Sequence, residues 1–287
     1  MTDDKVDVKY KLGILVVLYG CEYKDSATLL SLKELKLGSD VKLVIWNNGP
    51  THITVDASID YFPGVEIRSS IENLPLSYIY NCFLREFLCE KYVFFDHDSK
   101  VSSSYISSLI MEQSDLFLPR IVIGDKGFFP ICRQTLSPIV SDMKTDSYSV
   151  SSIMTGICIS EQLKAQYIDV YGSVFDERFA LYGIDTTFFI RMLMLPKMDV
   201  CVTAEVLHSL SSQDPIESKS EFRLKERAFD TAIHLRHYPS KTVFKAYCLG
   251  VMKSLMTGDL TLTKTFIKGF LTGVHPRSRT LIERKNA

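Results

Sequence analysis

The feature that most constrains the fold is a series of short, almost entirely apolar runs in the first hundred residues. The clearest are Leu12–Leu18, Val41–Trp46 and Tyr92–Phe95. Runs of this length and composition are typical of strands buried on both faces of a parallel sheet. Helical spacing is expected between them at residues 25–37, with Asp25-Ser26 as the N-cap, and at residues 76–90. A further short strand is expected at 65–68. This alternation predicts an α/β fold with a doubly wound, mostly parallel sheet flanked by helices. Ligands of such sheets bind at the carboxyl ends of the strands, and Tyr19, Asn47 and Asp96 are expected to share that edge.

The second half of the chain is less regular, and shorter elements are expected there. Strands are predicted on both sides of Pro119, at 153–159 with an interruption at Thr155-Gly156, and at 200–207. The Ser-rich segment 141–152 and the polar segment 209–221 are predicted to be mobile loops. Helices are predicted at 184–195, at 221–235 and in two amphipathic segments beyond Pro239.

An acidic pair follows the third apolar run. Asp96 and Asp98 are two positions apart, so along an extended chain they point the same way and His97 the other way. Two adjacent carboxylates repel each other unless they are solvated or share a divalent cation. Oxygen ligands of this kind suit Mg²⁺ or Mn²⁺ bridging to a phosphate. The alternative is that Asp-x-Asp is only the polar start of a loop.

Charge is unevenly distributed between two expected domains. Residues 240–287 carry nine basic and two acidic residues, net +7, whereas the rest of the chain is net −8. We expect one domain over 1–239, composed of a first half (1–100) and a second half (101–239), followed by a basic amphipathic helical extension over 240–287. The extension either docks on the core or lies on an anionic membrane surface.

Several classes of protein are disfavoured by the sequence. Seven cysteines, an odd number without a Cys-x-x-Cys pair, favour a reducing compartment over a disulfide framework. No P-loop, dinucleotide-binding glycine motif or Gly-x-Ser-x-Gly nucleophile elbow is present. No signal peptide or long apolar run is recognisable. We expect a cytoplasmic protein, at most peripheral at the inner face of the cell membrane, that binds no nucleic acid.

A set of short motifs, in order along nearly the whole chain, resembles the inverting glycosyltransferases of family 2, which have a GT-A fold. The likeness is greatest to bacterial rhamnosyltransferases of surface-polysaccharide biosynthesis. The motifs are Tyr19 after the first strand, Trp46-Asn47-Asn48-Gly49, Glu72-Asn73-Leu74 with Asn81, Phe95-Asp96-His97-Asp98-Ser99, Thr155-Gly156, Phe175-Asp176-Glu177-Arg178-Phe179, Gly183-Ile184-Asp185 with Arg191, His208, and Lys268-Gly269-Phe270 with Gly273. The sequence departs from the family at Asn47, where an aspartate is usual, and at Pro75, where a glycine is usual.

The resemblance implies specific roles. Asp98 would ligate Mg²⁺ or Mn²⁺, and Asp96 would hold the ribose or a metal-bound water. His208 would contact the diphosphate or the metal, and Asp185 would be the general base that takes the acceptor's proton. Donor binding would involve Tyr19, Asn47, Asn73, Asn81, Asp96 and Arg191, and acceptor binding Thr155 and Gly156.

Each role has a structural alternative in the residues themselves. Asp185 precedes helical spacing and could be a helix N-cap. A lone histidine such as His208 is often structural, and Tyr19 could be a half-buried tyrosine at a strand end. Arg191 could pair with an acid on its helix.

The combined reading is a metal-dependent inverting glycosyltransferase, by resemblance one that moves L-rhamnose from dTDP-rhamnose onto a lipid-linked polysaccharide acceptor. One alternative keeps the fold and uses a UDP-hexose donor. A second is a nucleotidyltransferase that makes sugar nucleotides, which would need a Gly-rich basic loop after the first strand. A third is a non-catalytic sugar-binding module.

Overall fold

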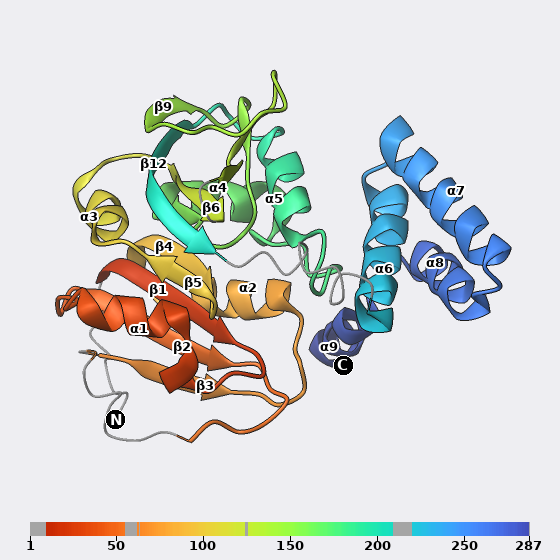
Figure 1. Ribbon diagram of the computed structural model, residues 1–287, viewed down its shortest axis with the longest axis horizontal. Helices are drawn as coiled ribbons and strands as arrows, with labels where there is room; N and C mark the ends of the chain where they lie inside the picture. Colours follow the sequence, from red (N-terminus) through yellow and green to blue (C-terminus); the bar gives the residue numbers. More distant parts are fainter. Residues whose placement is uncertain (1–9, 55–61, 63, 124–125, 209–219, 287) are drawn as a thin grey trace. The chain divides into compact units, whose positions relative to one another are not determined.

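The computed structural model describes residues 10–54, 62, 64–123, 126–208 and 220–286 (Figure 1). The chain divides into two compact units. The sheet unit comprises Met1–Asn73, Tyr80–Val174 and Phe188–Ser209, and the helical unit comprises Leu74–Ile79, Phe175–Thr187 and Leu210–Ala287. Each unit thus draws on distant parts of the chain, and the predicted division at residue 239 stays a prediction.

The sheet unit is built on a mixed, mostly parallel sheet in the order β3-β2-β1-β4-β11-β6-β12-β5. The strands are β1 (Tyr10–Leu18), β2 (Val41–Asn47), β3 (Glu66–Ser69), β4 (Cys89–Asp96), β5 (Ser99–Val101), β6 (Leu116–Ile123), β11 (Cys158–Ser160) and β12 (Asp199–His208), with β7 (Lys126–Phe129) on β6 and β9 (Met143–Asp146) on β12. Strands β3, β2, β1 and β4 are mutually parallel, and β11 runs antiparallel to β4 and β6. A separate pair is formed by β8 (Ile131–Cys132) and β10 (Val150–Ser151).

Helices cover both faces of this sheet. They are η1 (Tyr23–Asp25), α1 (Ala27–Glu34), α2 (Leu76–Glu86), α3 (Ser103–Met111), α4 (Glu161–Tyr171) and α5 (Ile184–Met192). On one face, leucines of α1 and Tyr105 of α3 pack into a core with alternate residues of β1. On the other, Phe83 of α2 makes edge-to-face contacts with Tyr92 and Phe94 of β4, with ring centroids 5.8 Å apart in both pairs. Residues that alternate along β1 and β4 therefore face opposite cores, which explains why their sequences are apolar throughout.

The predicted strands of the first hundred residues are confirmed, as are the helices that separate them, although the second helix ends at Glu86 rather than at residue 90. Several expectations for the second half are wrong in whole or in part, and the helix expected at 184–195 ends at Met192. Segment 141–152 is not a loop throughout, because Met143–Asp146 forms β9, paired with β12. Segment 153–159 is strand only from Cys158. The predicted loop 209–221 lies largely outside the described residues.

Pro119 lies inside β6 and does not separate two strands. On β6, strand β11 pairs only with Leu116 and Phe117, so this pairing ends before Pro119. On the other side, the register of β12 is irregular between Thr203 and Glu205, opposite Pro119. A proline is tolerated in a strand where ladder hydrogen bonds are already interrupted. Its ring lies against Gly156, where an added Cβ would be 2.5 Å from Pro119 Cγ.

We therefore expect Gly156→Ala to destabilise the protein more than Gly172→Ala. Both glycines have left-handed backbones (φ +78° and +74°), but Gly172 has no atom within 4 Å of the added Cβ. The left-handed conformation alone costs an alanine about 1–2 kcal/mol. The clash with Pro119 adds roughly 1–3 kcal/mol at Gly156. Denaturant unfolding of both variants measures the difference, and equal losses would contradict the packing described here.

The helical unit contains α6 (Glu221–His237), α7 (Lys241–Met256), α8 (Leu260–Thr272) and α9 (Pro276–Asn286). The helix at 221–235 and the two segments beyond Pro239 are confirmed, whereas α9 is an additional helix. Helices α6 and α8 approach closely because Gly269 lies against Ala232 and Phe229. Among the described residues, no helix is long and apolar enough to span a membrane.

Candidate metal and nucleotide site

The acidic pair lies at the edge of the sheet where the parallel strands end. Asp96 is the last residue of β4 and lies beside Val17 of β1, while Asn47, at the end of β2, lies beside Leu18. This confirms the expectation that the residues following the first three buried strands share one edge. Ligands of open α/β sheets bind outside the carboxyl ends of the strands.

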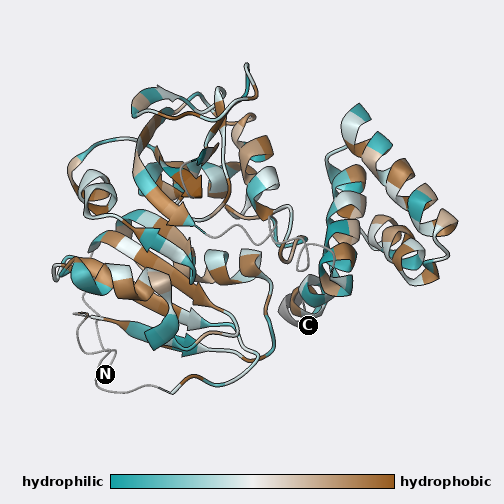
Figure 2. Ribbon diagram, viewed as in Figure 1, coloured by the Kyte–Doolittle hydropathy of each residue, from teal (hydrophilic) through white to brown (hydrophobic). Residues whose placement is uncertain are grey.

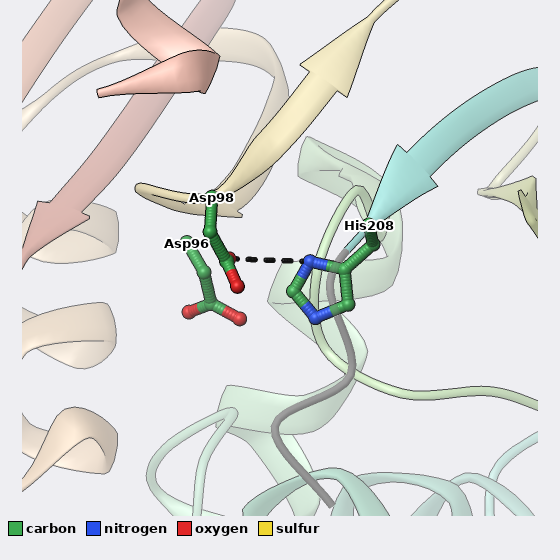
Figure 3. Close-up of side chains that lie close together, drawn as sticks. All are labelled: Asp96, Asp98 and His208. Atoms are coloured by element: carbon green, nitrogen blue, oxygen red, sulfur yellow. Dashed lines mark ion pairs between the residues drawn. The ribbon is translucent and has the colours of Figure 1, made fainter. Parts of the chain in front are cut away.

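His208 joins the acidic pair from the end of β12. Antiparallel pairing with β5 places His208 opposite Ser99, the residue after Asp98. His208 Nδ1 is 3.2 Å from Asp98 Oδ1 and 3.0 Å from Ser99 Oγ. Figure 3 shows the two carboxylates and the imidazole grouped together. One ligand atom of each of Asp96, Asp98 and His208 lies within 4.8 Å of the others.

The loop that carries the pair is held by α1. Ser26, the N-cap of α1, donates its hydroxyl to the His97 carbonyl at 2.8 Å. Thr28 donates its hydroxyl to the Asp96 carbonyl and accepts from the Ser99 amide at 3.0 Å. Both hydroxyl residues are fully buried. Sequence reasoning identified Ser26 only as a helix cap and missed Thr28, because nothing in the sequence pattern relates either residue to a loop seventy positions away.

The electrostatics of the cluster favour a cation. Burial and the neighbouring Asp98 raise the pKa of Asp96, although the imidazole of His208 opposes the shift. Burial of His208 disfavours its charged form, but the hydrogen bond to Asp98 and the charge of Asp96 outweigh it and raise its pKa. Concentrated negative charge therefore stabilises the protonated imidazole, and it would stabilise a metal cation in the same way.

The donor set fits a divalent cation. One ligand atom from each of the two carboxylates and the imidazole lies within 4.8 Å of the others. Small side-chain adjustments would bring all three within the roughly 2.0–2.6 Å that is typical of ligands to Mg²⁺, Mn²⁺ or Ca²⁺. Oxygen ligands together with one nitrogen suit Mn²⁺ well. Asp96, Asp98 and His208 are thus the residues that could hold a metal.

Other predicted donor residues fall into two groups. Tyr19 is exposed and accepts from Asn73 Nδ2 at 3.5 Å, so these two share a surface. Asn47 is buried, and its amide donates to the Thr51 carbonyl at 2.8 Å and to Ser69 Oγ at 3.0 Å, while Oδ1 accepts from the Gly49 amide. Asn47 therefore fixes the turn after β2.

The remaining two predicted donor residues are buried. Asn81 is 2% exposed on α2. Arg191 is buried at the end of α5, where it donates to the Ser173 carbonyl at 3.4 Å and stacks over Tyr171 at 4.8 Å. These contacts leave both the donor role of Arg191 and the alternative that it pairs with an acid as predictions.

The predicted acceptor residues support the acidic loop. Thr155 Oγ1 lies 2.8 Å from Ser99 Oγ and accepts from the Asp96 amide at 3.4 Å. The Gly156 amide donates to the Phe94 carbonyl at 2.6 Å. These bonds connect the 155–156 turn to the end of β4, so Thr155 and Gly156 position the metal cluster whether or not they also bind an acceptor.

Asp185 belongs to the helical unit, in the first turn of α5. The helix begins one residue earlier, at Ile184, so Asp185 is not its N-cap. Its Oδ1 accepts from the Thr186 amide at 2.7 Å. Burial raises the pKa of Asp185, and the carboxylate of Asp230 adds to the increase. A base with an elevated pKa is better matched to proton abstraction near neutrality.

The turn before Asp185 rests on α6. A Cβ at Gly183 (φ +85°) would be 2.2 Å from Asp230 Oδ1 and 2.8 Å from His234 Cε1. Asp230 and His234 form a pair at 2.7 Å.

Glu226 is the buried acid of this region. Its carboxylate lies 3.2 Å from His275 Nε2 and 2.8 Å from an Arg277 nitrogen. Burial opposes ionisation, but the hydrogen bond to His275 and the charge of Arg277 outweigh it and lower the pKa of Glu226. A lowered pKa gives stability that is present above the ordinary pKa and is lost as pH falls through the lowered value.

We expect Glu226→Gln to reduce the free energy of unfolding by about 3 kcal/mol at neutral pH, because the buried partner of Arg277 and His275 loses its charge. The deficit relative to wild type should shrink on acidification, when Glu226 protonates in the wild type. Glu221→Gln is the control, since this α6 side chain is 78% exposed beside Lys225 and its pair is worth at most about 1 kcal/mol. A deficit that is independent of pH would contradict the account.

No protein-family model matches the sequence, and no curated protein matches it either. Among solved structures, the fold is similar to that of TarS from S. aureus. The TarS 1–349 structure aligns with a TM-score of 0.54 and 15% identity, over 94% of this chain and 83% of that chain. The longer TarS structure gives 0.52 and 14% over the same share of this chain, which spans only 50% of that chain. TarS 1–349 in complex with UDP-GlcNAc gives 0.54 and 12%. The predicted fold class is confirmed: the sheet is GT-A-like, as in TarS.

Proposed function

We propose that this chain is a metal-dependent inverting glycosyltransferase of GT-A type that uses a nucleotide-sugar donor. The observation that carries the proposal is the group formed by Asp96, Asp98 and His208 at the carboxyl edge of the parallel strands. The likeness of the fold to TarS, which has been crystallised with UDP-GlcNAc, supports a nucleotide sugar as the ligand of this edge.

In this proposal the acidic cluster binds the donor's diphosphate through Mg²⁺ or Mn²⁺. Asp98 and His208 would hold the cation, and Asp96 would hold the ribose or a water beside it. A cation held there would supply positive charge to the departing diphosphate. Ser26, Thr28 and Ser99 keep the loop in place, so that the carboxylates need not reorganise when the donor arrives.

Asp185 is proposed as the general base. It takes the proton from the acceptor hydroxyl as that oxygen attacks the anomeric carbon of the donor, and the bond from that carbon to the diphosphate breaks in the same displacement. A single displacement inverts the configuration. The raised pKa of Asp185 supports this role, because it makes the carboxylate a stronger base than an exposed aspartate.

The family resemblance suggests L-rhamnose from dTDP-rhamnose as donor and a lipid-linked glycan as acceptor. The exposed Tyr19 and the half-buried Asn73 offer a surface for the base. The buried Asn47, Asn81 and Arg191 are the other donor-binding residues of this proposal. A UDP-sugar donor is the second candidate, favoured by the UDP-GlcNAc complex of TarS.

A thermal-shift series with dTDP-rhamnose, UDP-GlcNAc and their nucleoside diphosphates, each with Mn²⁺ or with EDTA, tests the proposal. We expect one donor to raise the melting temperature in Mn²⁺ and to lose that effect in EDTA, since ligand binding to the folded state stabilises it. If no nucleotide sugar shifts the melting temperature under either condition, the proposed donor binding is wrong.

A further inference from the structure

Helices α7 and α8 each expose an apolar stripe to solvent. On α7 the exposed apolar side chains recur at helical spacing and share one side of the helix, as follows from a repeat of 3.6 residues per turn. They are Phe244, Leu249, Met252, Leu255 and Met256 on α7, and Leu260, Ile267 and Leu271 on α8. Figure 2 shows hydrophobic residues running along both helices. We call these eight residues the exposed stripe.

The exposed stripe is not the face with which these helices pack. Tyr247 of α7 makes an edge-to-face contact with Phe266 of α8, with centroids 5.6 Å apart, and Gly250 lies against the same ring. Ser254 and Thr263 are buried and joined by a 2.7 Å hydrogen bond. Tyr247 therefore belongs to the packing side, while Phe244 and Leu255 belong to the exposed stripe.

The charges beside the exposed stripe are all positive. Every ionisable acid or base on α7 and α8 that carries charge near neutrality is a lysine, and all five are exposed: Lys241, Lys245, Lys253, Lys264 and Lys268. The nearest acid along the chain, Asp259, caps α8 by accepting from the Leu262 amide at 2.8 Å. Lysine stems can lie along an apolar surface while the ammonium groups reach outward.

We propose that the exposed stripe and its five lysines form an interfacial docking surface for an anionic lipid bilayer. An apolar helix face flanked only by lysines matches the boundary between acyl chains and acidic headgroups. A second copy of the same surface would bring lysines against lysines, so charge complementarity favours lipid over self-association. This inference does not depend on the transferase proposal, because it uses neither the metal cluster nor a donor.

Vesicle co-sedimentation of the full chain tests the docking surface. Vesicles of equimolar phosphatidylglycerol and phosphatidylcholine should bind the protein at low salt, and pure phosphatidylcholine should bind it much more weakly. Each lysine near an acidic surface contributes roughly fivefold in partitioning. A variant without four of them should therefore lose about 10²–10³-fold. The variant is Lys241→Gln, Lys245→Gln, Lys264→Gln and Lys268→Gln.

The matched control removes four exposed lysines from the sheet unit: Lys11, Lys126, Lys144 and Lys197, each changed to Gln. It lowers the net charge equally and should bind vesicles nearly as wild type does. A third variant, Leu249→Gln with Met252→Gln, removes apolar area at exposed positions, so it should keep the melting temperature and weaken binding. Equal loss of vesicle binding in both lysine variants would overturn the proposal. So would a wild-type dimer, seen by sedimentation, that the third variant abolishes without any effect on vesicle binding.

Discussion

Asp185→Asn is expected to lower the rate of sugar transfer by about 10²–10⁴-fold. The amide has nearly the shape of the carboxylate but cannot accept the acceptor's proton. Its oxygen can still accept the hydrogen bond that the Thr186 amide donates to Asp185 Oδ1. Binding of the nucleotide sugar in Mn²⁺ should be nearly unchanged, because the base acts on the acceptor. Single-turnover transfer assays and isothermal titration of the donor measure the two quantities separately.

The matched control for this substitution is Asp169→Asn, the same chemical change at an exposed position of α4. It should leave transfer and stability unaffected. If Asp185→Asn transferred sugar at the wild-type rate, Asp185 would not be the base. If Asp185→Asn lowered the melting temperature and the transfer rate in proportion, the role of Asp185 would be only to stabilise the start of α5.

Asp98→Asn is expected to abolish the Mn²⁺ dependence of donor binding and to weaken binding in Mn²⁺ by about 10²-fold or more, since a charged ligand of the cation is lost. In EDTA the variant and the wild type should bind equally weakly. Asparagine fills the same volume, so the contacts of His208 and Ser99 around it can persist. Titration of the donor at a series of Mn²⁺ concentrations gives both affinities.

Asp40→Asn serves as control, because Asp40 is an exposed acid of the sheet unit paired with Lys11 at 3.1 Å. It should retain the full Mn²⁺ dependence. An Asp98→Asn protein that keeps this dependence would exclude Asp98 as a metal ligand and would leave the resemblance to TarS as a matter of fold alone.

The parts of the fold that could be predicted are those in which a local sequence pattern is compatible with only one kind of structure. The uninterrupted apolar run Leu12–Leu18 of β1 avoids water only if both faces of the strand are buried. Ser26 before a helical pattern predicts an N-cap, which the structure confirms. The order of the first strands then placed Asn47 and Asp96 at one edge without knowledge of any contact.

Other features depend on pairings that a single sequence does not reveal. A proline normally interrupts a strand. Strand β6 continues through Pro119 because the register of β12 is irregular opposite this residue. Segment 143–146 has a polar, exposed sequence and is a strand because β12 offers it an edge. His208 was a candidate ligand by resemblance, but its position beside Asp98 follows from the pairing of β12 with β5. The hydrogen bonds from Thr28 to the acidic loop likewise become evident only in the three-dimensional structure.

The most direct measurement is a crystal structure of the full chain with Mn²⁺ and a nucleoside diphosphate, recorded at a wavelength where manganese scatters anomalously. We predict an anomalous peak about 2.0–2.6 Å from a carboxylate oxygen of Asp98, with Asp96 and His208 as neighbours and diphosphate oxygens completing the shell. Nucleotide density at the sheet edge without a manganese peak beside Asp98, or a peak elsewhere, would contradict the central claim that this cluster binds the cation.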